Sequence, residues 1–161
     1  MTEFIFISKK NRVRYLRIIE PIGNLLARIG VHPHALSVAG LILSIMAGFV
    51  YSTGTFFWAA WVVALAGTCD ALDGVLARRT STISTFGAFL DSALDRYSDV
   101  FILMGLAWYF AGGPIFLESH EQDIASFQSP WAVACIIMAI AGSFMVSYTR
   151  ARAGALGLNC R

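Results

Sequence analysis

Five aspartates fall inside two long apolar stretches of this 161-residue chain, at spacings that would place them on helix faces. They are Asp70, Asp73, Asp91, Asp95 and Asp99. Because side chains three or four residues apart share one face of a helix, each group is expected to line a single face. An ionised carboxylate inside a bilayer costs at least about 2.5–3.5 kcal/mol unless it finds a partner, so carboxylates placed there indicate a function.

The chemistry that such a cluster suggests is the binding of divalent cations. A short polar turn, residues 78–85, joins the two stretches, so the helices should run antiparallel and bring their carboxylates to one depth. Like charges a few ångströms apart repel each other, and a bound cation removes that repulsion. An oxygen-only ligand set suits Mg²⁺ or Mn²⁺. Two such ions about 4 Å apart would clamp a diphosphate and stabilise the charge on its leaving half.

Small residues accompany the carboxylates. Gly74 and Ala77 follow on the same face of the helix that carries Asp70 and Asp73, and Gly87 precedes Asp91 by one turn. They leave room for a ligand, or for close approach of two helices. Arg78 lies at the rim, where it would pair with a phosphate.

Composition places these helices in a membrane. Hydrophobic residues make up 57% of the chain and charged residues 14%, which is too apolar for an ordinary soluble domain. Four segments approach or reach the roughly 20 residues that cross a bilayer. We expect these spans at Ala35–Ser52, Phe56–Ala77, Phe86–Ala111 and Pro130–Thr149. The predicted fold is an all-α integral-membrane bundle of four transmembrane helices.

The segment before the first span mixes basic with apolar residues and is interrupted at Pro21. This pattern predicts an N-terminal amphipathic helix in the membrane interface. We therefore divide the chain into a cytoplasmic juxtamembrane segment, 1–30, and a transmembrane catalytic domain, 31–161. No signal peptide is expected. The net charge of only +2 implies no nucleic-acid partner.

The distribution of basic residues predicts the orientation. Arg and Lys concentrate before the first span, between the second and third, and after the fourth, which is one side of the membrane if the spans alternate. That side should face the cytoplasm, and the carboxylates should lie near it, in the inner membrane. The tryptophans fall near the opposite ends of the spans, as an aromatic belt would. They are Trp58, Trp61, Trp108 and Trp131.

Two other classes of function are open to membrane helices that carry carboxylates. A small ion or proton transporter would spread its aspartates through the membrane depth, whereas these cluster near one surface. A transferase that uses polyprenyl diphosphates would also hold Mg²⁺ on such helices. The glycine spacing and the early Arg78 argue against that alternative, and competition by CDP or CMP would separate the two.

The pattern Asp70-x-x-Asp73-Gly74-x-x-Ala77-Arg78, followed after eight residues by Gly87-x-x-x-Asp91-x-x-x-Asp95, fills eight specified positions. It resembles the signature of the CDP-alcohol phosphotransferase family. The resemblance implies a membrane enzyme of phospholipid biosynthesis, usually a homodimer, that moves a phosphatidyl-type group from a CDP-linked lipid to an alcohol and releases CMP. The lipid would be CDP-diacylglycerol or CDP-archaeol.

The resemblance also implies roles for individual residues. Two Mg²⁺ or Mn²⁺ ions would be held by Asp70, Asp73, Asp91 and Asp95, and Asp95 would also act as general base on the acceptor hydroxyl. The CDP-lipid contacts would be Asp70, Gly74, Ala77, Arg78, Ser84 and Ser37. Ser37 belongs to a Pro33-His34-Ala35-Leu36-Ser37 segment that resembles a Pro-Asn/Asp-x-x-Thr motif of the family, from which His34 departs.

The acceptor is expected to be inositol phosphate. The segments 86–99 and 147–153 are similar to the branch that makes phosphatidylinositol phosphate or its archaeal ether analogue. Arg150 and Arg152 would bind the acceptor phosphate. Glycerol phosphate or another alcohol is the alternative. Because the family typically has six spans, we expect either that this chain is truncated after the fourth or that the last two spans are absent.

Overall fold

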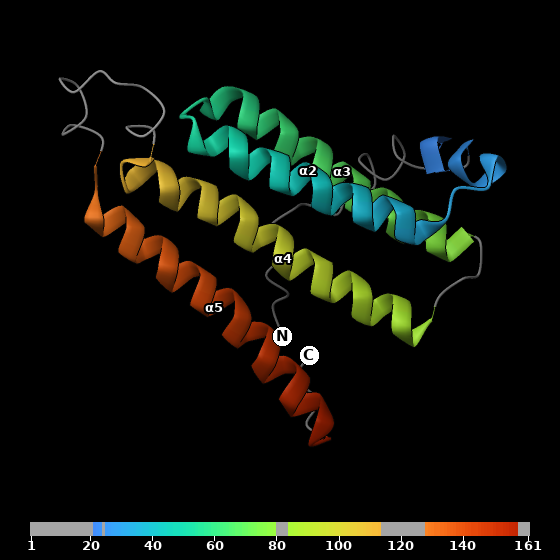
Figure 1. The fold of residues 1–161 in the computed structure, drawn as a ribbon. Helices are drawn as coiled ribbons and strands as arrows, with labels where there is room; N and C mark the ends of the chain where they lie inside the picture. Colours follow the sequence, from blue (N-terminus) through green and yellow to red (C-terminus); the bar gives the residue numbers. More distant parts are fainter. Residues whose placement is uncertain (1–20, 24, 80–83, 114–127, 158–161) are drawn as a thin grey trace, which may run out of the picture.

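The computed structural model describes residues 21–23, 25–79, 84–113 and 128–157, and these residues form helices and turns without strands. Four long helices follow in the order α2 (Pro33–Ser52), α3 (Phe56–Arg79), α4 (Thr85–Phe110) and α5 (Pro130–Ala155), as Figure 1 shows. The first begins two residues before the predicted span and the last extends six residues beyond it. The all-α fold predicted from the sequence is confirmed for the described residues.

Three of these helices are long and apolar enough to cross a membrane, at Pro33–Ser52, Phe56–Ala77 and Pro130–Ala155. The remaining helix, α4, has 26 residues and therefore also has the length. Its first two-thirds carry four charged side chains, Asp91, Asp95, Arg96 and Asp99. Helix α4 therefore carries more charge than an ordinary membrane span, and two of its charged residues, Asp91 and Asp95, are predicted site residues.

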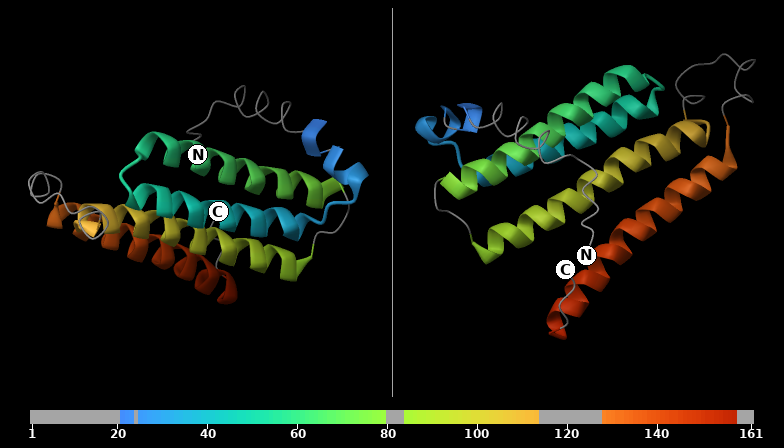
Figure 2. Two further views of the ribbon diagram at one scale, coloured as in Figure 1. Left: turned by 45° about the horizontal axis from the view of Figure 1, so that its top comes forward. Right: turned by 180° about the vertical axis from the view of Figure 1, so that it is seen from behind.

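Helix α2 lies between α3 and α4 and packs closely against both, as Figure 2 shows from two directions. Its buried residues are small or compact and lie on one side of the helix, at spacings of seven, four, three and one; they are Pro33, Gly40, Ser44, Ala47 and Gly48. Small residues on one face let helix backbones approach each other in a membrane. Helices α3 and α4 approach each other less closely than either approaches α2. The expected antiparallel pair is therefore held together by a third helix.

Helices α2 and α4 are in close backbone contact where Gly48 and Gly105 meet. A Cβ atom at Gly105 would overlap the backbone carbonyl of Gly48, and one at Gly48 would overlap that of Phe101. The backbones of α2 and α4 therefore meet here without room for a side chain between them.

Gly105→Ala is expected to destabilise the bundle by about 1–3 kcal/mol, because the added methyl group has no space and the backbones must separate. Thermal unfolding of the detergent-solubilised protein would measure the effect. Gly154→Ala is the matched control, since nothing lies within 4 Å of a Cβ at that helical glycine. It should leave the Tm unchanged or slightly raise it, and an equal loss in both variants would contradict the close packing at Gly105.

The helices α2 and α3 are joined by a tight turn in which Gly54 has a φ of +79°, a left-handed conformation that favours glycine. The same end of the bundle holds all four tryptophans, which are 50–83% exposed. They are Trp58, Trp61, Trp108 and Trp131. The carboxylates lie toward the other end.

Residues 21–23 and 25–29 are helical and rest on α3. Leu26 packs against the buried Leu72 and Val75, and Gly23 lies so close to Val75 that a Cβ there would be 2.9 Å from its Cγ1. The rest of the predicted N-terminal amphipathic segment, residues 1–20, lies outside the described residues. The face of this helical segment that bears Gly23 and Leu26 therefore packs on the end of α3 where the carboxylates lie.

Candidate metal centre

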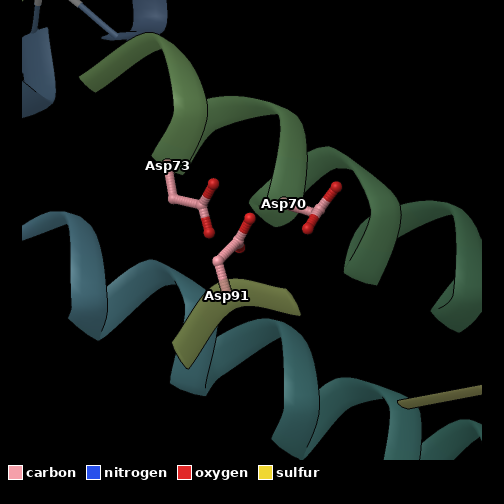
Figure 3. A group of neighbouring side chains, drawn as sticks. All are labelled: Asp70, Asp73 and Asp91. Carbon is pink, nitrogen blue, oxygen red and sulfur yellow. The ribbon is translucent and has the colours of Figure 1, made fainter. Parts of the chain in front are cut away.

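Three carboxylates from two helices meet at one end of the bundle. Asp70 and Asp73 lie one turn apart near the end of α3, and Asp91 lies near the start of α4. One oxygen of each lies within 4.8 Å of the others (Figure 3). The prediction that the two helices bring these three side chains together is confirmed.

The third helix of the group, α2, orients one of these carboxylates. Asp73 is only 6% exposed, and the Ser37 hydroxyl donates a hydrogen bond of 2.6 Å to its Oδ2. Ser37 thus contacts a carboxylate, whereas its expected contact was with the CDP-lipid. Asp70 and Asp91 are exposed and face open space between α3 and α4.

Two cavities adjoin the carboxylates, and both are lined by Ser37 and Asp91. The outer cavity, of about 290 Å³, also includes Asp73 and extends toward the turn between α3 and α4. Its other lining residues include His34, Gly74, Ala77, Ser84 and Gly87. The inner cavity, of about 160 Å³, also includes Asp70 and extends deeper into the bundle. Its other lining residues include Gly40, Ser44, Gly67, Asp95, Ser98 and Asp99.

The residues predicted to contact the CDP-lipid divide between these cavities. Gly74, Ala77, Ser84 and Ser37 line the outer cavity, whereas Asp70 lines the inner one. The Ser84 side chain also caps α4, since its Oγ accepts a hydrogen bond of 2.9 Å from the Gly87 amide. Arg78 lies in the last turns of α3, and its side chain is outside the described part.

Gly87 makes a close contact in the outer cavity. A Cβ there would lie 3.0 Å from the Ser84 Oγ and 3.1 Å from the His34 Cε1, so these side chains would have to shift slightly to admit one. The glycine thus both lines the cavity and lets a side chain of α2 come close. His34 thereby lines the cavity beside a residue of the signature, although its identity departs from the motif.

Asp95 stands apart from the group of three. It lines the inner cavity with Asp70 and Asp91, and its carboxylate forms an ion pair with the adjacent Arg96. Arg150 and Arg152 lie at the far end of α5, which diverges from α4 toward its C-terminus (Figures 1 and 2). Within the described residues, the structure does not bring these arginines to the carboxylates.

Asp99 forms a contact that its spacing alone does not predict. The Ser143 hydroxyl of α5 donates a hydrogen bond of 3.1 Å to the Asp99 Oδ2. No sequence signal identifies Ser143, because the pairing of α4 with α5 is needed to find it.

The three carboxylates fit a small divalent cation. Their oxygens belong to hard, anionic ligands of the kind that Mg²⁺ and Mn²⁺ prefer. Ligand oxygens bonded at about 2.1 Å to such an ion lie about 3.0 Å apart when adjacent and about 4.2 Å apart when opposite. The three carboxylate oxygens lie within 4.8 Å of one another, so a small shift of the side chains would bring them to bonding distance. Three protein ligands leave further coordination positions for phosphate oxygens. The arrangement can therefore hold a metal and present it to both cavities.

Comparison with known proteins agrees with this chemistry. The family model described as CDP-alcohol phosphatidyltransferase matches residues 30–158. An archaetidylinositol phosphate synthase from Pyrococcus horikoshii is 35% identical over 148 residues, covering 92% of this chain and 69% of that relative.

Two solved structures of a Mycobacterium tuberculosis phosphatidylinositol phosphate synthase are also similar. The structure with CDP-DAG bound has a TM-score of 0.71 and 32% identity, covering 90% of this chain and 67% of that one. The structure with manganese and citrate has a TM-score of 0.70 and 29% identity, covering 89% and 63%. The chain thus spans about two-thirds of the length of these proteins.

Proposed function

The chain belongs to the CDP-alcohol phosphatidyltransferase family, and we propose on that basis that it transfers a phosphatidyl-type group from a CDP-linked lipid to inositol phosphate, releasing CMP. The observation that carries this proposal is the meeting of Asp70, Asp73 and Asp91 between two cavities. A diphosphate at this point would have space on both sides, one for its nucleotide and one for its lipid. The donor would be CDP-diacylglycerol or CDP-archaeol.

We assign the metal ligands to Asp70, Asp73 and Asp91, with Asp95 completing a centre for two Mg²⁺ or Mn²⁺ ions. When bound, the ions supply charge neutralisation for the diphosphate and stabilise the departing CMP. The chain's own contribution is orientation. Ser37 holds the buried Asp73 through its 2.6 Å hydrogen bond, and α2 packs closely against both helices that carry the carboxylates.

Asp95 is proposed as the general base. It lines the inner cavity within reach of the same space as Asp70 and Asp91, and the neighbouring Arg96 pairs with its carboxylate. The acceptor hydroxyl oxygen would bond to the phosphorus that carries the lipid. The bond from that phosphorus to the bridging oxygen would break, CMP would leave with the electron pair, and the proton would pass to Asp95.

The nucleotide is proposed to occupy the outer cavity. Four residues of the expected contact set, Ser37, Gly74, Ala77 and Ser84, line it. The absence of bulky side chains at positions 74 and 77 leaves the cavity open along α3. Asp70, from the inner side, and Arg78, at the end of α3, would contact the diphosphate.

The acceptor phosphate is proposed to bind to Arg150 and Arg152, and the names of the relatives support inositol phosphate as acceptor. Helical geometry separates the two arginines, because residues two apart differ by about 200° around the axis. Ser143 faces α4, where it binds Asp99. Arg150 follows Ser143 by seven residues and lies on the same face, whereas Arg152 lies on the opposite face.

Arg150→Ala is therefore expected to raise the KM for inositol phosphate about 10- to 100-fold, and Arg152→Ala is expected to raise it less. The KM for the CDP-lipid should stay within about twofold in both variants. Steady-state kinetics with each substrate varied in turn would measure both constants. An unchanged acceptor KM in both variants would leave the arginines as membrane anchors only.

The protein is an integral-membrane protein, and we propose that all four helices α2 to α5 span the inner membrane. Residues 31–161 would form the catalytic domain. Residues 1–30 would form a juxtamembrane segment with an amphipathic helix on the cytoplasmic surface. The distribution of Arg and Lys and the exposed tryptophans at the opposite end support a site that opens to the cytoplasm. The protein would act as a homodimer.

A substrate panel tests the proposed function. The purified protein would be incubated with radiolabelled CDP-lipid, Mg²⁺ or Mn²⁺, and inositol phosphate, glycerol phosphate or inositol. Label should pass to inositol phosphate and CMP should appear, both only with metal present. Transfer to glycerol phosphate instead would contradict the acceptor, and lack of transfer to any alcohol would contradict the activity.

A further inference from the structure

Two hydrogen bonds between described residues link helices α4 and α5. At the tryptophan-bearing end, the Ser129 amide donates a hydrogen bond of 3.1 Å to the Phe110 carbonyl. About halfway along, the Ser143 hydroxyl donates to the Asp99 Oδ2 at 3.1 Å. The two helices move apart toward the C-terminus of α5, as Figures 1 and 2 show from opposite sides. The second link therefore joins α5 to α4 on the stretch along which they diverge.

The packing of α5 on the other helices is shallow. None of its described residues is buried, and only a stripe that includes Val133, Ile136, Ile140 and Ser143 is partly buried, so a polar contact on this stripe has a large share in setting its rotation. In a bilayer, helices associate through close packing of small residues and through hydrogen bonds between polar side chains. A hydroxyl bonded to a carboxylate fixes both the rotation of a helix about its axis and its register along the neighbour.

Both partners are connected to the proposed site through their own helices. Asp99 lines the inner cavity and lies two turns beyond Asp91. Ser143 precedes Arg150 by seven residues, about 10 Å along α5. A tilt of α5 about Ser143 would therefore displace Arg150 relative to Asp91 and Asp95, with little effect on the three helices that form the metal centre.

We propose that the Asp99–Ser143 hydrogen bond is a positioning contact, which holds α5 at the rotation and tilt that present Arg150 to the acceptor. This inference rests on the proposed function. Asp99 and Ser143 do not touch the reacting atoms in this account. They act through Arg150, so their loss should affect binding of the acceptor and leave binding of the CDP-lipid intact.

Kinetic constants separate this role from a general structural one. Ser143→Ala and Asp99→Ala should each raise the KM for inositol phosphate about three- to tenfold, and leave the KM for the CDP-lipid within about twofold. Ser143→Thr, which keeps the hydroxyl, should recover most of the loss. Thr149→Val is the matched control, because the Thr149 hydroxyl donates to the Met145 and Val146 carbonyls of its own helix.

The double variant tests whether the two residues act as one unit. Asp99→Ala combined with Ser143→Ala should raise the acceptor KM no further than either single change. Equal increases in the KM of both substrates, or additive effects in the double variant, would overturn the positioning role. If the wild-type protein transfers label but these variants match it, this inference fails while the proposed function stands.

A distance measurement gives a readout that does not depend on activity. Spin labels would be attached at Phe89→Cys on α4 and Leu156→Cys after α5, two exposed positions, in a protein whose Cys69, Cys135 and Cys160 are replaced by Ser. Double electron–electron resonance should give a broader or longer distance distribution after Ser143→Ala, and an unchanged one after Thr149→Val. Identical distributions in all three proteins would overturn the inference.

Discussion

Asp91→Asn is expected to lower kcat/KM by about 10³-fold or more and to abolish high-affinity Mn²⁺ binding. Asp91 is the only member of the group of three that α4 contributes, and it lines both cavities. Asparagine keeps the shape of the side chain but removes the negative charge and one anionic oxygen. The remaining pair, Asp70 and Asp73, comes from one helix and does not close around an ion from the opposite side.

Electron paramagnetic resonance of free Mn²⁺ during titration would measure this loss directly. Ser92→Ala is the matched control, because Ser92 is the next residue on α4 and is exposed. The control should bind Mn²⁺ as the wild type does and keep its activity. Wild-type Mn²⁺ affinity in Asp91→Asn would remove the carboxylate from the metal centre.

Asp95→Asn is expected to give a different defect. If Asp95 accepts the proton of the acceptor hydroxyl, kcat should fall by about 10²–10⁴-fold, the range typical of a lost general base. Metal-dependent binding of the CDP-lipid should be largely retained, because Asp70, Asp73 and Asp91 still gather without it. Single-turnover transfer and equilibrium binding of radiolabelled CDP-lipid would measure the two effects separately.

The pairing of Asp95 with Arg96 supplies the control for this variant. Arg96→Gln removes the cation and leaves the carboxylate, so kcat should fall less than in Asp95→Asn. Full activity of Asp95→Asn would remove the base assignment. Loss of CDP-lipid binding as severe as in Asp91→Asn would instead place Asp95 chiefly among the metal ligands.

Helical periodicity was sufficient to predict the core of the site. The spacing of Asp70 and Asp73 places them on one face, and the short polar turn brings Asp91 to the same depth on the antiparallel helix. Their convergence is a consequence of helix geometry and of the short connection, both of which are local properties of the chain. For that reason the three carboxylates meet as predicted.

The role of α2 in orienting the Asp73 carboxylate was harder to predict. Periodicity determines which residues share a face but does not determine which face meets which helix. The small residues of α2 at positions 40, 44, 47 and 48 carried that information, since they mark a face that two other backbones can approach. With that face assigned to α3 and α4, the hydrogen bond from Ser37 to Asp73 follows from its position on the same side of α2.

The position of α5 relative to the carboxylates could not be predicted from the sequence. Arg150 and Arg152 were both predicted to bind the acceptor phosphate, because they are two residues apart and both are positively charged. On a helix they point to opposite sides, and the contact between Ser143 and Asp99 identifies the side that faces α4. Their relation to the carboxylates depends on the angle between α4 and α5, which no short segment of sequence determines.

Carboxylates of α3 and α4 are expected to bind the cation together. Crystals of the protein grown with Mn²⁺ would be measured by anomalous diffraction at the manganese edge. An anomalous peak bonded to oxygens of Asp70, Asp73 and Asp91 is the expected result. Manganese bound elsewhere while these three side chains point apart would contradict it.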